Sequence, residues 1–409
     1  MIDKKCSFCK SELNFKFADL DTSPIANNLE SGEISVNKTK YPLNVYVCQE
    51  CMLVQLGDFL NHDLIFKSDY PYFSSYSTSW VNHAKKFVDF ICKRFKNNLE
   101  FVIEIASNDG YLLQFVKKQK IEYLGIEPSQ SVANKAIQSG IKTELKYFNK
   151  QTSKFIVENY KKASFIVANN VLAHVPDINS FVDGLSFLLD KNGVISIEFP
   201  YLKNLIDNVQ FDTIYHEHYY YFSLTALVTI FKKYNLNIFD VQKISTHGGS
   251  LRIFVSHFQS IHKTTNAVKD CLSDECKNSL NTLHGYKDFQ KNIDLYSNKL
   301  NNLLKSLKEN NKKIVGFGAA AKGVTLFNYA NISSDTLSYI VDSNPNKVGF
   351  NYPGTNIIIN SVDDLFLDEE VDVIFIIPWN LGSEISNIIR QKISKQVDIY
   401  LCDQNLTRL

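Results

Sequence analysis

The sequence of 409 residues lacks an excess of charge of either sign. Lys and Arg total 44 and Asp and Glu total 43, which leaves a formal net charge of +1. Nucleic-acid binding requires a basic surface, so this balance argues against nucleic acid as a partner. The sequence also lacks any uncharged apolar run near the ~20 residues that cross a bilayer. We therefore expect no membrane partner.

A secretory signal is also missing. The first residues, MIDKKCSFCKSEL, are charged and contain no apolar stretch, so we expect a cytoplasmic protein. No internal repeat or low-complexity linker is visible, and the length suits two or three domains. We expect these domains to span residues 1–70, 71–278 and 279–409.

Four of the eight cysteines form two Cys-x-x-Cys pairs, Cys6 with Cys9 and Cys48 with Cys51. Four thiolates at about 2.3 Å satisfy a tetrahedral zinc ion and leave no position open. The paired spacing therefore favours structural zinc over chance burial or a redox pair. Because the 38 residues between the pairs exceed the usual ribbon spacing, we expect them to form a small sheet. The remaining cysteines are expected to be ordinary thiols.

Residues 101–200 alternate apolar runs with segments of helical spacing. We expect strands at 101–106, 123–129, 164–175 and 194–200, a helix from about Asn108, and a helix over 181–193 that Gly193 closes. Another helix presents Trp80, Phe87, Ile91 and Phe95 on one side. Buried strands joined by helices predict an α/β fold with a parallel sheet covered on both faces.

The last third of the chain predicts a helix and a second α/β unit. Apolar residues from 279 to 312 recur every three or four positions, as in one long amphipathic helix. We expect it to pack on its own protein, with a coiled-coil dimer as the alternative, so the oligomeric state stays open between monomer and homodimer. Residues 313–329 read as strand, glycine turn and helix, with further strands at 337–345, 372–378 and 398–402.

A nucleoside site is indicated by FVIEIASNDGYLLQFV, where a strand ends at a polar turn with one glycine, Gly110. Ligands of such sheets bind beyond the carboxyl ends of the strands. Glu127 ends the next strand, 17 residues after Gly110, where a carboxylate can accept both hydroxyls of a ribose. One glycine supports a pyrophosphate cradle poorly. A nucleoside without phosphates fits better, and S-adenosylmethionine is the common one.

Several stretches together carry a resemblance to a family. VIEIASNDGYLL, GIEPS, ANNVLAHVPD and YHEHYYYFS, behind a four-cysteine module, resemble the sugar C-methyltransferases that act on nucleotide-linked keto-deoxysugars. HGGSLR at 247–252 and VGFGAAAKG at 315–323 extend the resemblance over nearly the whole chain. It implies a zinc-binding N-terminal domain, a central class I methyltransferase (Rossmann-like) domain, and a C-terminal Rossmann-like domain that helps to bind the sugar nucleotide.

The resemblance also implies site residues. The segment 73–77 resembles the stretch that folds over the methionine end of the cofactor, and Tyr76 is expected to face the substrate. Relatives tend to carry glycine at position 106, and Ala106 is tolerated there if its backbone keeps a negative φ. The predicted cofactor site comprises Ala106, Ser107, Asn108, Gly110, Leu112, Glu127, Pro128, Asn169 and Asn170.

FDTIYHEHYYYFS at 211–223 is the predicted catalytic segment. By resemblance, Tyr215, Glu217 and His218 match the active-site Tyr-x-Glu-His, and His174 matches a further active-site histidine. Methyl transfer to carbon requires an enolate and so a base, and histidine suits that role. We assign His218 as the base with Glu217 as its partner or alternative, and Tyr215 and His174 as donors to sugar oxygens. His216, at a variable position, is left out.

The C-terminal unit carries a second nucleotide-binding pattern. Gly316-x-Gly318-x-x-Ala321 is followed by Asp342 after 21 residues, which keeps an NAD-dependent oxidoreductase as a rival. Lys322 favours a sugar-nucleotide diphosphate instead, because an ammonium group near a glycine turn suits phosphate oxygens. The predicted substrate site comprises Tyr76, His247, Ala320 and Lys322, although His247 could equally cap a turn.

The expected function is methyl transfer from S-adenosylmethionine to carbon, at C3, of a nucleotide-linked 4-keto-deoxysugar in deoxysugar biosynthesis. The aromatic run 219–222 is expected to keep water from the enolate. An O- or N-methyltransferase on the same scaffold and a non-catalytic sugar-nucleotide-binding protein are the alternatives.

Overall fold

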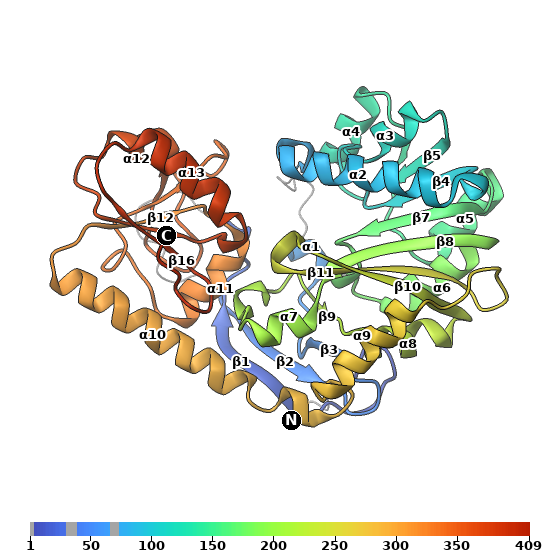
Figure 1. The fold of residues 1–409 in the computed structure, drawn as a ribbon, viewed down its shortest axis with the longest axis horizontal. Coiled ribbons are helices and arrows are strands. Elements are labelled where there is room, and N and C mark those ends of the chain that lie inside the picture. Colours follow the sequence, from blue (N-terminus) through green and yellow to red (C-terminus); the bar gives the residue numbers. More distant parts are fainter. Residues whose placement is uncertain (1–3, 30–38, 66–72) are drawn as a thin grey trace.

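The computed structural model describes residues 4–29, 39–65 and 73–409. Its strands form three sheets, one in each part of the molecule (Figure 1). A small sheet lies at the base, a seven-stranded sheet fills one lobe, and a five-stranded sheet fills the other. No helix in these ranges is both long and apolar enough to cross a membrane.

The basal sheet has the order β1-β2-β3-β9. Strands β1 (Phe15–Ser23) and β2 (Tyr41–Val47) come from the insert between the cysteine pairs, which confirms the sheet expected there. Strand β3 (Val54–Leu56) follows, and β9 (Tyr220–Tyr221) joins it from far along the chain. The N-terminal module is therefore built partly from the segment that follows the predicted catalytic residues.

The seven-stranded sheet has the order β10-β11-β8-β7-β4-β5-β6. Strands β8, β7, β4, β5 and β6 pair with one another in parallel. Strand β11 runs antiparallel to both β8 and β10. Their bounds are β4 (Phe101–Ile105), β5 (Glu122–Ile126), β6 (Thr143–Glu144), β7 (Ala163–Asn169), β8 (Leu189–Pro200), β10 (Leu236–Ile244) and β11 (Ser250–His257).

Helices cover both faces of this sheet, as the sequence predicts (Figure 1). One face packs under α2 (Thr78–Arg94), α3 (Leu113–Lys118) and α4 (Gln130–Gln138), and the other packs against α5 (Lys150–Asn159), α6 (Ile178–Leu188) and α8 (Leu224–Lys233). The alternation along β4 decides this: Val102 faces the α2 side, whereas Phe101 and Ile103 face the α6 side. Shorter helices are α1 (His62–Ile65), α7 (Leu202–Asp207) and α9 (Asn266–Lys277).

The five-stranded sheet is wholly parallel, with the order β14-β13-β12-β15-β16. Its elements are β12 (Ile314–Phe317), α11 (Ala321–Tyr329), β13 (Ile340–Asp342), β14 (Ile359–Ser361), α12 (Val362–Leu367), β15 (Val373–Ile376), α13 (Gly382–Lys392) and β16 (Asp398–Leu401). Helix α10 (Phe289–Glu309) runs from this lobe to the basal sheet (Figure 1). There Phe289 stacks on Phe17 with ring centroids 4.4 Å apart, so the helix packs on its own protein.

Four predicted element boundaries are wrong. The helix expected from Asn108 begins at Leu113, because Asn108 (φ +51) and Gly110 (φ +82) occupy left-handed conformations that no α-helix contains. The helix expected to 193 ends at Leu188, and Gly193 lies inside β8, where a Cβ would come within 2.9 Å of the Ala163 carbonyl oxygen.

The long helix expected over 279–312 starts only at Phe289, because Ser279 turns the chain at φ +58 and a 3-10 turn, η6 (Leu283–Tyr286), intervenes. Likewise, the strand expected to 175 ends at Asn169, since Asn170 has φ +53. At Ser279 and Asn170 a left-handed residue interrupts an apolar pattern that is otherwise regular.

Ala106 does not keep the negative φ that the sequence argument requires, because its φ is +53. Only glycine adopts this region without steric cost, and an L-residue there costs roughly 1–2 kcal/mol. The turn after β4 is therefore strained at the position where the resemblance leads us to expect glycine.

Candidate functional site

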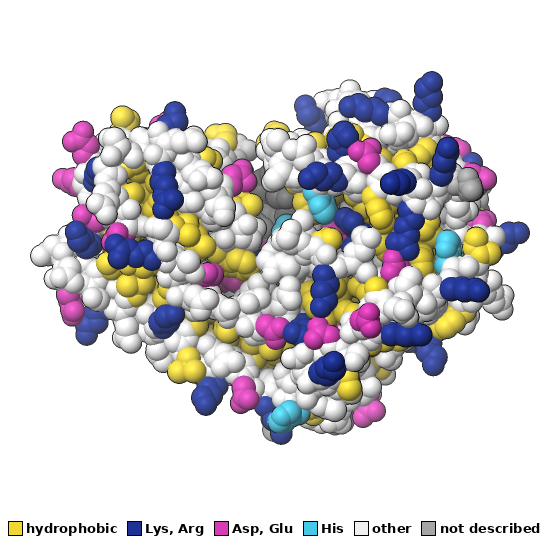
Figure 2. Space-filling model, viewed as in Figure 1, with side chains coloured by type: hydrophobic (Ala, Val, Ile, Leu, Met, Phe, Trp, Pro, Cys, Tyr) yellow, Lys and Arg dark blue, Asp and Glu magenta, His cyan; other side chains and the backbone are white. Residues whose placement is uncertain are grey.

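A cavity of about 1700 Å³ lies between the two lobes, and the space-filling view is hollowed there (Figure 2). Ligand pockets commonly measure about 300–1,000 Å³, so this one has room for a cofactor and a second molecule. Its wall combines residues of the basal module, the seven-stranded lobe and the five-stranded lobe. The carboxyl ends of strands β4, β5 and β7 face the cavity, as expected for the ligand site of a parallel sheet.

The predicted cofactor end of the cavity is organised by Glu127, which directly follows β5. Its Oε2 accepts from the backbone N–H of Asn108 and its Oε1 from that of Ser129, both at 2.9 Å. Burial raises the pKa of this carboxyl, and the two backbone donors oppose that rise. The carboxylate thus ties together the turns after β4 and β5, and each oxygen retains a lone pair for a ribose hydroxyl.

Most of the predicted cofactor residues line this cavity. On its wall lie Ala106, Asn108, Glu127, Pro128, Asn169 and Asn170. Ser107, Gly110 and Leu112 do not reach the wall, and Leu112 is fully buried in the core beside α2. These three residues belong to the turn after β4 but do not face the cavity.

Orphaned polar atoms at the end of β7 fit a polar cofactor. In the described part of the chain, the side-chain oxygens Oδ1 of Asn169 and Asn170 are buried without a hydrogen-bond partner. Leaving a buried acceptor unpaired costs about 1–3 kcal/mol, so such atoms indicate a ligand with donors. S-adenosylmethionine carries donors at its amino and hydroxyl groups, and the residues present fit it.

The segment 73–77 folds against this end of the cavity. Backbone N–H groups of Ser74 and Ser75 donate to the side chains of Asn108 (2.8 Å) and Asp109 (3.1 Å). Tyr76 lines the cavity but is 73% exposed, so it stands at the mouth. The side chains of the turn after β4 therefore hold the segment that carries Tyr76.

His218 is fixed in one tautomer. Its Nδ1 lies 2.8 Å from the carbonyl oxygen of Thr213, which can only accept, so Nδ1 carries the proton. Its Nε2 then offers a lone pair and accepts from the Tyr215 hydroxyl at 2.9 Å. Burial lowers the pKa of His218 well below its ordinary value, and His174 lowers it further. His218 is thus a neutral imidazole at neutral pH.

The other predicted catalytic residues surround this imidazole. His174, from the 3-10 turn η3 (Leu172–His174), lies edge-on to His218 with ring centroids 4.8 Å apart. His174, Tyr215, Glu217 and His218 all line the cavity. His216 points the other way, with its Nε2 3.3 Å from the Pro42 carbonyl oxygen. The cavity wall therefore gathers the four residues that the sequence selects, three from the segment and His174 from η3.

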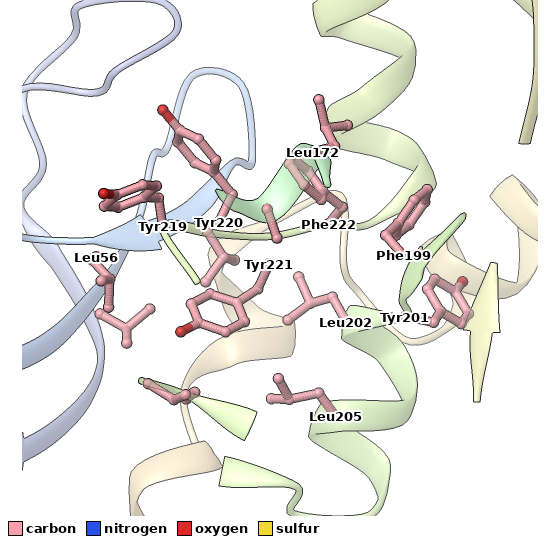
Figure 3. Packing of buried hydrophobic residues seen from close by; sticks show 14 of the residues in the cluster. Leu56, Leu172, Phe199, Tyr201, Leu202, Leu205, Tyr219, Tyr220, Tyr221 and Phe222 are labelled. Carbon is pink, nitrogen blue, oxygen red and sulfur yellow. The ribbon is translucent and has the colours of Figure 1, made fainter. Parts of the chain in front are cut away.

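The aromatic run that follows does not line the cavity, contrary to the expectation that it walls off the enolate. Tyr219 and Tyr220 extend away from Tyr221, and Phe222 lies beside Leu172 (Figure 3). All four aromatic side chains are buried in the core that joins the basal sheet to the central lobe. Their role is to anchor the segment that carries His218.

The far end of the cavity belongs to the five-stranded lobe. Lys322, in the first turn of α11, donates from Nζ to Asn380 Oδ1 at 2.6 Å and lies 4.3 Å from the Trp379 ring centroid. Ala320 and His247 also line the wall. Burial lowers the pKa of His247 to about 4, and the Lys322 charge contributes. His247 is therefore neutral, with its Nε2 3.4 Å from Asn170 Nδ2.

Contacts across the lobes fix this end. Trp379 donates from Nε1 to the buried Asp212 at 2.7 Å, and Thr325 donates from its hydroxyl to the carbonyl oxygen of Ile214 at 2.6 Å. Gly248 (φ +84) leaves no room for a side chain, because a Cβ would lie 2.2 Å from the Trp379 ring. The five-stranded lobe is thus fastened to the first residues of the catalytic segment, directly before Tyr215.

The four cysteines fit a zinc ion. The sulfur atoms of Cys6, Cys9, Cys48 and Cys51 all lie within 4.8 Å of one another, and the Cys6–Cys51 pair is 3.6 Å apart. A tetrahedron with zinc–sulfur bonds of about 2.3 Å has edges of about 3.8 Å, close to this arrangement. The site lies in the basal module, away from the cavity wall. It therefore stabilises the fold and touches no reacting group.

Three residues on the cavity wall escape sequence reasoning. Asn27 comes from the basal module and donates to Glu217, 190 positions further along. Trp80 stacks on His83 with ring centroids 4.9 Å apart, and Lys347 donates to the Ala319 carbonyl oxygen at 2.7 Å. Trp80 was visible only as part of an apolar helix face. Asn27 and Lys347 stand in no motif, so only the tertiary contacts identify them.

Family models match three consecutive parts of the chain. Residues 6–66 match a zinc binding domain, residues 81–241 a methyltransferase domain, and residues 245–400 the C-methyltransferase C-terminal domain. The matched parts coincide with the cysteine cluster, most of the seven-stranded lobe, and the region from β11 through β16.

The chain is 28% identical over 383 residues to C-methyltransferase NovU of Streptomyces niveus, covering 93% of this chain and 91% of that protein. Among solved structures, magnesium protoporphyrin IX methyltransferase of Synechocystis PCC 6803 matches 43% of this chain and 79% of its own, with 13% identity and a TM-score of 0.33. An S-adenosylmethionine-dependent methyltransferase of Clostridium acetobutylicum matches 42% and 92%, with 14% identity and a TM-score of 0.35.

Proposed function

Because this chain is an S-adenosylmethionine-dependent C-methyltransferase with an N-terminal zinc-binding domain, we propose that its substrate is a nucleotide-linked 4-keto-deoxysugar, methylated at C3. One observation carries the proposal. A neutral histidine whose unprotonated Nε2 accepts from a tyrosine hydroxyl lies with a carboxylate on the wall of a cavity whose far end holds a lysine at a glycine turn. The histidine, carboxylate and tyrosine suit the removal of a proton from carbon. The lysine at the glycine turn suits a diphosphate.

The carbon nucleophile requires loss of the C3 proton next to the C4 ketone. His218 Nε2 accepts that proton in the proposed step, and the electron pair of the C–H bond moves onto the ketone oxygen as an enolate. The bound cofactor supplies an electrophilic methyl group. When the new carbon–carbon bond forms and the carbon–sulfur bond breaks, the C4 ketone is restored. The step requires the Tyr215 hydroxyl to turn its donation from His218 Nε2 to a sugar oxygen. Together with His174 it then holds C3 in line.

The low pKa of His218 keeps Nε2 unprotonated at neutral pH but makes the imidazolium costly. Glu217 lies in the same cavity wall, and in the proposed step its carboxylate offsets that cost while the proton is held. A histidine and a carboxylate together therefore suit the step better than either alone.

The nucleotide end of the substrate is assigned to Lys322 and the turn before α11. Gly318 (φ +90) opens this turn, and the nearby Lys347 brings a second ammonium group to the wall. Asp342, which a dinucleotide site would use for a ribose, accepts instead from the backbone N–H groups of Ala319 and Asn344, both at 2.8 Å. This arrangement supports a diphosphate at the turn over NAD.

The test is hydrogen exchange at the substrate carbon. Enzyme given a 4-keto-deoxysugar nucleotide and S-adenosylhomocysteine in deuterated water should exchange the C3 hydrogen, followed by NMR, without forming product. The His218→Asn variant should lose exchange and turnover, while His216→Asn, whose ring faces the basal sheet, should keep both. Methyl transfer without exchange at carbon would replace the proposal with an O- or N-methyltransferase on the same scaffold.

Two further variants locate the base. Glu217→Gln should abolish exchange if the carboxylate takes the proton, and should slow it if the carboxylate stabilises the imidazolium. Tyr215→Phe should be mildest, because loss of one neutral hydrogen bond costs ~0.5–1.5 kcal/mol. Exchange at the wild-type rate in both His218→Asn and Glu217→Gln would place the carbon-acid chemistry elsewhere.

A further inference from the structure

The basal module reaches into the cavity through one side chain, that of Asn27. After β1 the chain turns through buried Pro24, Ile25 and Ala26, and Asn27 emerges half-buried on the cavity wall. Its Nδ2 donates to Glu217 Oε1 at 2.5 Å. A short contact to a carboxylate is a charge-assisted hydrogen bond, about twice as strong as a neutral one. The buried turn fixes the amide where it meets Glu217.

The same module also holds the chain just after Glu217. Strand β3 pairs with β9 through Val54 with Tyr221 and Gln55 with Tyr220, and the Leu56 N–H donates to the Tyr219 carbonyl oxygen at 2.9 Å. Gln55 is itself held, because its Oε1 accepts from the backbone and the hydroxyl of Ser7. The module thus positions Glu217 twice, through the backbone of the residues that follow it and through its carboxylate.

An amide in contact with a carboxylate favours the ionised form, because Nδ2 can donate a hydrogen bond but cannot take up a proton. His174, His247 and Lys322 act electrostatically on His218, and all four residues line the same cavity as Glu217. Tyr219 lies on the other side, and burial together with the Glu217 charge raises its pKa to about 12, so it stays neutral. Asn27 is a contact on Glu217 that comes from outside the catalytic segment.

We infer that Asn27 is a positioning residue of the active site, through which the N-terminal module holds Glu217 ionised and aimed beside His218. The inference rests on the proposed function for the role of Glu217. It makes the N-terminal module a part of the catalytic machinery, since its amide sets the state of a carboxylate in another domain.

The first test needs no substrate. Zinc-loaded full-length protein labelled with [δ-13C]glutamate is titrated by NMR, and the Glu217 signal is assigned by its loss in Glu217→Gln. Removing a hydrogen bond to a charged group should move the titration of Glu217 upward by about 1–2 pH units in Asn27→Ala. Asn14→Ala, at an exposed position of the same module, should leave it unchanged. An unchanged Glu217 titration in Asn27→Ala would overturn the inference.

The second test uses carbon exchange in deuterated water. The pH profile of C3 exchange in Asn27→Ala should shift in the same direction as the NMR titration, with at least a tenfold lower rate at neutral pH. Asn27→Asp should also lower the rate, because two adjacent carboxylates resist joint ionisation, whereas Asn14→Asp, which adds the same charge, should not. Zinc content and S-adenosylmethionine affinity should stay at wild-type values in all four variants.

The outcomes separate the two claims. If the wild type shows no exchange but Glu217 titrates higher in Asn27→Ala, the proposed carbon chemistry fails and the positioning of Glu217 stands. If the wild type exchanges and Asn27→Ala has the same pH profile, only the inference fails. If Asn27→Ala lowers the exchange rate equally at every pH, without shifting the pH profile, Asn27 has only a structural role. This outcome would also overturn the inference.

Discussion

Ala106, on the cavity wall at the predicted cofactor end, has a strained backbone. Its φ of +53 is a left-handed conformation that suits glycine. Ala106→Gly should raise the free energy of unfolding by about 1 kcal/mol, because the relief of roughly 1–2 kcal/mol outweighs the added freedom of the unfolded glycine. Equilibrium denaturation measures the change. Ala136→Gly, inside helix α4, should destabilise instead and serves as the opposite control. A destabilised Ala106→Gly would show that the methyl group packs favourably.

His247 should make the protein sensitive to acid. Burial and the Lys322 charge lower its pKa to about 4, against about 6.5 when unfolded. The unfolded chain therefore binds more protons between these values, so the stability that the neutral form provides is lost as pH falls from 6.5 to 4.

His247→Asn tests this pH dependence, because asparagine tolerates the left-handed backbone at this position (φ +53) and does not titrate. The variant should gain stability relative to the wild type as pH falls through that window, by at most about 1.4 kcal/mol per pH unit. Denaturant unfolding at pH 7, 5.5 and 4.5 measures the gap. A gap independent of pH would mean that His247 titrates alike when folded and unfolded.

At the scale of elements, Glu127 joins the turn after β4 to the turn after β5. Glu127→Ala should weaken S-adenosylmethionine binding by ~1.5–3 kcal/mol, the range for hydrogen bonds to charged groups. Glu127→Gln should be nearly as harmful, because both oxygens accept backbone N–H groups and an amide nitrogen must face one of them. Calorimetry measures the affinity. Glu122→Ala, on the exposed end of β5, is the control, and unchanged affinity in Glu127→Ala would remove the acid from the site.

The pairing of β3 with β9 links zinc to the catalytic segment at a distance. Cys48→Ser should destabilise the basal module, since metal binding is coupled to folding. Hydrogen exchange should then rise at residues 219–222 as well, while β15 in the other lobe keeps its protection. Exchange by mass spectrometry, with zinc content by elemental analysis, measures both. Protection at 219–222 equal to the wild type would show that β9 holds without the module.

At the scale of the whole molecule, the catalytic segment is held from two sides. The basal module pairs with β9, and the five-stranded lobe contacts Asp212 and Ile214 just before Tyr215. The lobes therefore set the position of His218 as well as the walls of the cavity. An isolated central lobe would lack both supports.

A Lys322 variant tests whether the five-stranded lobe binds the sugar nucleotide while the central lobe binds S-adenosylmethionine. Lys322→Met keeps most of the side-chain volume over Trp379 and removes the charge. It should weaken binding of the sugar nucleotide by about 10–100-fold, as expected for the loss of a charged hydrogen bond, and leave S-adenosylmethionine affinity unchanged. Calorimetry with each ligand measures this, with Lys299→Met on the exposed face of α10 as control. Equal weakening of both ligands would instead indicate a disturbed interface.

The sequence by itself determined what can be read from neighbours along the chain. Paired cysteines, apolar runs of strand length and the Tyr-x-Glu-His stretch predicted the zinc-binding module, the α/β lobes and the residues around His218. These signals are local, because metal knuckles, strand periodicity and strand–turn–helix sites each occupy a few consecutive positions.

Only the tertiary structure decided the rest. Left-handed residues such as Ser279 and Asn108 ended or delayed helices that the apolar pattern alone would continue. Strand β9 joined a sheet more than 160 residues away, which turned the aromatic run into an anchor rather than a cavity wall. Asn27 met Glu217 for the same reason: which side chains face each other across domains depends on packing between distant segments, and no spacing along the chain encodes it.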